Sequence, residues 1–131
     1  MSFRDPRVLA WEETLKRVFD EIDHQLEDQY GGTYPLHPAR AARGKTANPE
    51  SDGLFNIGAS FSPGYGSRSG RGYVVDVRMA TPAAVPERVI LAIEEDVAAR
   101  LRVLLPEHFP GRNLEVVRDG HVFKITGDLS F

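Results

Sequence analysis

Residues 61–75, FSPGYGSRSGRGYVV, contain the residue types that most often hold a phosphate group. Glycines at 64, 66, 70 and 72 make the backbone pliable, and Arg68 and Arg71 supply positive charge. The dinucleotide-binding fingerprint G-x-G-x-x-G, however, leads from a strand into a helix. Here Ser69 stands at the third glycine position and a strand-like run follows. Without a helix N-terminus to present aligned N–H groups to a pyrophosphate, we interpret the segment as a hairpin tip.

A second segment, ARAARGKT at 39–46, resembles the end of a nucleotide-binding P-loop. The pattern G-x-x-x-x-G-K-[ST] requires glycine where Ala39 stands, a strand before it and a helix after it. The flanking sequence predicts neither element, so we exclude nucleotide hydrolysis. Arg40, Arg43 and Lys45 remain as a basic loop, which we expect to be solvated unless an anion binds there.

Residues 71–77, RGYVVDV, begin like the first ribonucleoprotein motif of RNA-recognition domains. In those domains the aromatic side chains of the motif face outward and stack on bases. Tyr73, in contrast, shares a strand face with Val75 and Val77, so we expect it in the core. The opposite face carries Val74 and the charged Asp76 and Arg78. The segment therefore favours a buried strand over an RNA-binding surface.

Metal and acid–base chemistry find little support in the residue spacing. Glu21 and His24 form one E-x-x-H, whereas di-iron bundles need two such motifs on two helices. The chain has no cysteine and no G-x-S-x-G nucleophile motif. We expect no metal, no cofactor and no catalytic residue. An enzyme with a site built from loop residues such as His37 and Asp52 remains an alternative.

Length and composition place the chain among globular proteins. Its 131 residues suit one domain, 1–131, and the apolar and charged fractions of 41% and 27% are ordinary. The first residues lack the apolar core of a signal peptide, and no apolar run approaches the roughly 20 residues of a membrane span. We therefore expect a cytoplasmic protein that does not enter a membrane.

The charge is distributed unevenly along the chain. The net charge is −3, but residues 30–80 carry six basic and three acidic side chains, a net charge of +3. An overall negative charge argues against a protein devoted to nucleic acid. The middle third is nevertheless the place where an anionic ligand would be accepted.

The elements that position these residues follow from the hydrophobic periodicity. Apolar residues at spacings of three and four predict helices over 6–29 and 86–105. Strict alternation predicts strands over 54–61 and 72–80, with Phe55, Ile57, Ala59 and Phe61 of the first strand facing inward. Residues 30–53 show no period, and a connection of this length is usually either functional or mobile.

A second hairpin closes the chain at 113–127. Asp119-Gly120 is a preferred dipeptide of the type I′ turn, which would pair Glu115 with Lys124. The same register puts Leu114, Val116, Phe123 and Ile125 on one apolar face.

The order helix-strand-strand-helix-strand-strand predicts an α+β fold. We expect a two-layer sandwich, with a four-stranded antiparallel sheet of order 1-2-4-3 and both helices on one face. The exposed sheet face and the strand edges are the surfaces that would need a partner. We expect a non-catalytic binding or assembly module that self-associates there. The alternative is weak binding of RNA or a phosphorylated ligand through the basic loops 40–45 and 68–71, with Arg40, Arg43, Lys45, Arg68 and Arg71 as contacts.

Overall fold

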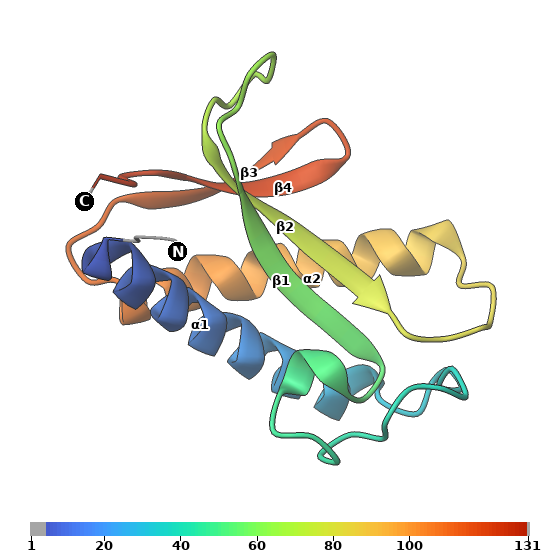
Figure 1. Ribbon diagram of the computed structural model, residues 1–131. Coiled ribbons are helices and arrows are strands. Elements are labelled where there is room, and N and C mark those ends of the chain that lie inside the picture. The colour runs from blue at the N-terminus through green and yellow to red at the C-terminus, as the bar shows by residue number, and fades with distance from the viewer. Residues whose placement is uncertain (1–4, 131) are drawn as a thin grey trace.

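The computed structural model describes residues 5–130 and arranges them in two layers (Figure 1). A four-stranded antiparallel sheet forms one layer, with strand order β1-β2-β4-β3, and two helices cover one of its faces. The predicted α+β sandwich and its strand order are confirmed. Along the chain the elements are α1 (Pro6–Tyr30), η1 (Pro49–Ser51), β1 (Phe55–Ser62), β2 (Gly72–Met79), α2 (Glu87–His108), β3 (Leu114–Asp119) and β4 (Val122–Gly127).

Helix α1 begins where its sequence signals predict. The Asp5 carboxylate accepts a hydrogen bond of 2.8 Å from the N–H of Arg7. Pro6 occupies the first helical turn, where a backbone N–H would have no partner within the helix, so its missing N–H costs no hydrogen bond. The predicted apolar stripe packs against the sheet and against α2. Of that stripe, Trp11, Leu15, Val18, Ile22 and Leu26 are buried, and Phe19, which was not predicted, is buried with them.

The C-terminal hairpin keeps its predicted faces but not its predicted register. The two-residue turn is Gly120-His121, so Asp119 pairs with Val122 and Val117 pairs with Lys124. Gly120 has a φ of +62°, while no non-glycine residue described has a positive φ, which excludes the type I′ turn. The predicted pairing of Glu115 with Lys124 is therefore wrong. The shift is two residues, and side chains alternate with a period of two, so Val116, Phe123 and Ile125 are still buried beneath the sheet.

Phe61 departs from the expected inward packing. It pairs with Tyr73 in the β1–β2 ladder, and the two rings make an edge-to-face contact at 5.6 Å. Tyr73 is buried, but Phe61 remains 54% exposed. The inward-facing side of β1 therefore ends in an exposed aromatic ring.

Neither helix in the described range has an apolar stretch long enough to span a bilayer.

Candidate functional site

The five basic residues predicted to bind an anion fall into two separate groups. Arg40, Arg43 and Lys45 lie in the connection after α1, whereas Arg68 and Arg71 lie in the tip of the β1–β2 hairpin, residues 63–71. Figure 1 shows these segments at opposite ends of the long hairpin. The structure does not bring the two groups together.

Arg40 is turned toward the main chain of its own connection. Its Nη2 donates to the carbonyl oxygens of Glu50 (2.6 Å), Asp52 (3.0 Å) and Phe55 (3.0 Å). Its Nε donates to the carbonyl of Gly53 at 3.1 Å. Charge-assisted bonds to several carbonyls hold a loop strongly, so Arg40 orders the end of the 30–53 connection.

The other basic residues of that connection lie at its surface. Arg43 forms an ion pair with Asp28 at 2.8 Å and donates to the carbonyl of His24 at 3.2 Å. The side chain of Lys45 is exposed in the following turn. Arg43 and Lys45 are therefore accessible, but Arg43 is already paired with an acidic side chain.

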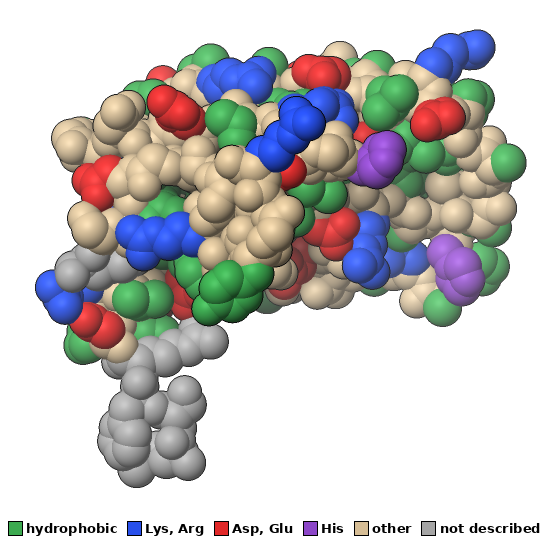
Figure 2. Space-filling model, turned by 90° about the horizontal axis from the view of Figure 1, so that it is seen from above, with side chains coloured by type: hydrophobic (Ala, Val, Ile, Leu, Met, Phe, Trp, Pro, Cys, Tyr) green, Lys and Arg blue, Asp and Glu red, His purple; other side chains and the backbone are tan. Residues whose placement is uncertain are grey.

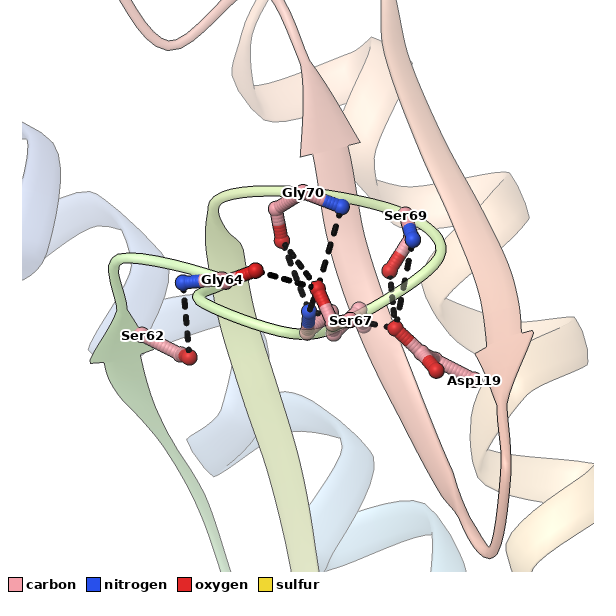
Figure 3. A network of polar contacts seen from close by, with 7 residues as sticks. Ser62, Gly64, Ser67, Ser69, Gly70 and Asp119 are labelled. Atoms are coloured by element: carbon pink, nitrogen blue, oxygen red, sulfur yellow. Dashed lines mark hydrogen bonds and ion pairs between the residues drawn. The ribbon is translucent and has the colours of Figure 1, made fainter.

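The hairpin tip is an ordered loop that covers part of the sheet. Ser67 Oγ bonds the carbonyls of Gly64 and Gly70, and the Ser69 hydroxyl donates to Asp119 at the end of β3 (Figure 3). Lys124 of β4, only 3% exposed, donates to Ser67 Oγ, to the Gly70 carbonyl (2.7 Å) and to Asp119 (3.2 Å). The tip therefore lies over the sheet face opposite the helices.

This packing explains the electrostatics of Asp119. The Ser69 hydroxyl, and after it the Lys124 ammonium group, hold the pKa of the Asp119 carboxyl below its ordinary value. Sequence reasoning missed Lys124 and Asp119 as partners of the tip. The sequence offered one signal, the position of Lys124 on the outward face of a strand. That signal was not sufficient, because lysines at such positions are usually solvated.

The first residue of β1 is sealed along its outer edge. The Phe55 N–H donates to Glu27 Oε1 at 2.9 Å, and the Phe55 carbonyl accepts from Arg40. A carboxylate and a guanidinium thus stand where a neighbouring strand would otherwise bond. Glu27 is buried, and its role was not foreseen from the sequence.

Beyond Phe55 the edge of β1 is unpaired. In an antiparallel ladder, alternate residues direct their N–H and C=O groups toward one neighbour, so the residues between them direct theirs to the other side. Since Phe55 bonds outward, Ile57, Ala59 and Phe61 also direct their main-chain groups away from β2. None of these groups has a hydrogen-bond partner among residues 5–130.

The opposite edge of the sheet is better protected. Arg102 of α2 donates to the carbonyl of Val116 at 2.9 Å, and Arg118 pairs with Glu95 of α2 at 3.2 Å. Side chains of α2 thus reach β3, whereas β1 presents its second half without such a cover. The β1 edge is therefore the better candidate for strand pairing.

A groove with both apolar and charged side chains accompanies the unpaired edge. A pocket of about 220 Å³ lies between α1 and β1, and its apolar lining includes Leu15, Phe19, Ile57 and Ala59. The charged lining residues are Glu12, Lys16, Asp20 and Glu50, and Lys16 bonds Asp20 of α1 and Asn48 of the connection. Unpaired main-chain groups, this groove and the exposed Phe61 ring thus lie along one strand.

The comparisons with known proteins cover the whole of this architecture. A protein family described as "Uncharacterised protein" matches residues 6–127, from the start of α1 to the end of β4. A protein of Borreliella burgdorferi described as "Uncharacterized protein" is 38% identical over 117 residues, which cover 89% of this chain and 91% of the relative. No solved structure matches the chain. Because the match spans both helices and all four strands, the chain belongs to this family.

Proposed function

We propose that this chain is a non-catalytic binding and assembly module whose β1 edge pairs with the β1 edge of a second copy. The observation that supports the proposal is the unpaired row of main-chain groups at Ile57, Ala59 and Phe61. An unpaired edge is a template for strand addition, and proteins that avoid such pairing usually cover or charge the edge. Among residues 5–130, side-chain hydrogen bonds close only the first residue of this edge.

The edge is complementary to itself. An antiparallel pair centred on Ala59 would place Ile57 opposite the partner's Phe61, and the reverse, around a twofold axis. Directly opposed side chains of paired strands lie about 5 Å apart. The partner's Phe61 would then cover the groove between α1 and β1, and its exposed ring would be buried.

Sedimentation equilibrium over a wide concentration range tests this proposal. The unmodified chain should dimerise, and Ala59→Pro should be monomeric because proline removes the central outward N–H. The β2 ladder does not use that N–H, so the variant should retain its circular dichroism spectrum. A chain that stays monomeric at all concentrations would contradict self-association.

A second variant tests the contribution of the Phe61 ring to dimerisation separately from that of the main-chain hydrogen bonds. Phe61→Ser should weaken the dimer by at least about tenfold, because an aromatic side chain loses its burial. Tyr65→Ser is the matched control, since Tyr65 is 93% exposed in the tip and lies outside the groove. Equal weakening by both substitutions would place the interface away from β1.

A further inference from the structure

A second pocket lies away from the β1 groove, between the C-terminal half of α1 and residues 43–52. Its volume is about 340 Å³, and its lining includes two buried carboxyl groups, those of Asp23 and Asp52. Arg43, Gly44 and Thr46 contribute to the accessible part of the lining. The pocket shares no lining residue with the β1 groove, so its role is independent of strand pairing.

The buried charged groups around this pocket have partners, with one exception. Glu27 holds the Phe55 N–H, and the Arg40 guanidinium holds main-chain carbonyls. Asp52 Oδ2 accepts from the Thr46 N–H at 3.1 Å and from the Thr46 hydroxyl at 2.8 Å. Asp23 is 3% exposed, and its Oδ2 has no hydrogen-bond partner among residues 5–130. A buried acceptor without a donor is costly, which marks it as a site that a ligand can satisfy.

We propose that this pocket binds a small organic cation through a primary ammonium group, with Asp23 as the anchoring carboxylate. The unpartnered oxygen requires an N–H or O–H donor, and the surrounding charge favours a cation. The Asp23, Glu27 and Asp52 carboxyl groups lie close enough to influence one another, with the Arg40 guanidinium beside them. Arg43 does not neutralise them, because it is paired with Asp28.

The donor set fits an ammonium group better than a metal ion. Among residues 5–130, no three His, Asp or Glu side chains gather as metal ligands. A single ammonium group carries three donors, which suits one unpartnered carboxyl group together with nearby main-chain and hydroxyl oxygens. The volume of the pocket falls within the range of small-molecule sites.

Binding should be linked to the protonation of Asp23. Burial first, and then the charges of Glu27, Asp52 and Asp20, raise the pKa of Asp23 to about 7, against the opposing effect of Arg40. A cation that binds the carboxylate must displace this proton. The affinity should therefore rise about tenfold per pH unit up to pH 7 and be constant above it.

A nuclear magnetic resonance titration of the full chain with methylammonium chloride, at constant ionic strength, tests the site. Saturable shifts of the Asp23, Gly44 and Thr46 amides are expected, with a dissociation constant of about 10 mM at best for so small a probe. Tetramethylammonium has the same charge but no N–H donor and should not bind. An equal response to both cations would overturn the proposal.

Three substitutions locate the effect. Asp23→Asn should weaken methylammonium binding by at least tenfold, while Glu13→Gln, on an exposed position of the same helix, should not. Imidazole groups also titrate near neutrality, and His24 lines the pocket, so His24→Gln must retain the pH profile. Unchanged binding by Asp23→Asn, or a pH profile lost with His24, would refute the assignment.

A measurement on the unmodified chain covers the case in which Asp23→Asn does not fold. Without ligand, the chemical shift of the Asp23 carboxyl carbon should titrate near neutral pH. Saturating methylammonium should lower the pKa of this carboxyl group. A pKa that does not move would overturn the proposal, as would tighter saturable binding of Mg²⁺ than of methylammonium at the same amides.

Discussion

At the scale of single residues, Asp23 dominates the expected pH response of the folded state. Its pKa is raised to about 7, chiefly by burial. The pKa values of Asp119 and Asp128 are instead lowered, chiefly by hydrogen bonds from Ser69 and Ser130. Burial acts to raise the pKa of Asp52, but hydrogen bonds from Thr46 and other groups outweigh it, so this pKa is also lowered. Those three carboxyl groups stabilise the fold above their unfolded pKa of about 3.9 and lose that contribution in acid. Asp23 acts in the opposite direction.

The sign for Asp23 gives a specific prediction. Between about pH 4 and pH 7 the folded state retains a proton that the unfolded chain releases, so stability falls as pH rises through this window. The full cost, on the order of 4 kcal/mol, is present above pH 7. Asp23→Asn should therefore raise the free energy of unfolding about 2–3 kcal/mol more at pH 8 than at pH 5, measured by urea denaturation. Glu13→Gln should show no such difference, and an equal gain at both pH values would contradict the prediction.

At the scale of elements, the hairpin tip is held by the sheet that it covers. Lys124 joins the tip to β3 and β4 through Ser67, Gly70 and Asp119 (Figure 3). Gly64 allows the loop to close on itself, because a Cβ atom there would lie within 2.4 Å of the main chain of Gly70 and Arg71. The tip is therefore packed against the sheet face opposite the helices and is not a pliable end.

Two sets of substitutions in this region should differ sharply. Lys124→Met removes the charged donor from Asp119 and from the Gly70 carbonyl, which keep only their bonds from Ser69 and Ser67. The variant should cost about 2–4 kcal/mol in a denaturation experiment. Amide exchange at Ser67–Gly70 should become faster. The double variant Arg68→Ser, Arg71→Ser changes exposed side chains of the same loop and should stay within about 0.5 kcal/mol. A neutral Lys124→Met would show that the tip does not depend on the sheet.

At the scale of the whole molecule, the positive charges are dispersed. The view from above shows Lys and Arg side chains interspersed with Asp and Glu (Figure 2). Arg40 is committed to carbonyl oxygens and Arg43 to Asp28, while Arg68 and Arg71 lie at the far end of the first hairpin. Phosphate recognition usually needs several cations along one surface.

We therefore predict that short RNA and polyphosphate do not bind saturably, even at about 50 mM salt, where phosphate contacts are strongest. A fluorescence anisotropy titration would measure this directly. Saturable binding that weakens in the Arg68→Ser, Arg71→Ser variant, but not in a Lys45→Ser variant, would instead establish the tip as an anion site.

The sequence alone determined the element order and most of the buried faces. These features follow from local periodicity, which is the reason that the second hairpin kept its faces although its register moved by two residues. The strand order was predicted on the assumption that the last strand lies beside the first hairpin, and the pairing of β2 with β4 confirms it. The exposure of Phe61 was not predictable in this way, because alternation assigns a side chain to a face of the strand but does not show whether another element covers that end of the face.

Only the tertiary structure decided what the charged residues do. Lys124 is buried by a loop more than fifty positions away in the sequence. Arg40 bonds main-chain carbonyl groups, and a pattern of side-chain types gives no information about such partners. Asp23 and Glu27 lie one turn apart on a helix face that reads as polar, yet they are buried because the 40–53 connection folds over them. Burial and partners of such groups arise from contacts between distant segments, and hydrophobic periodicity carries no information about them.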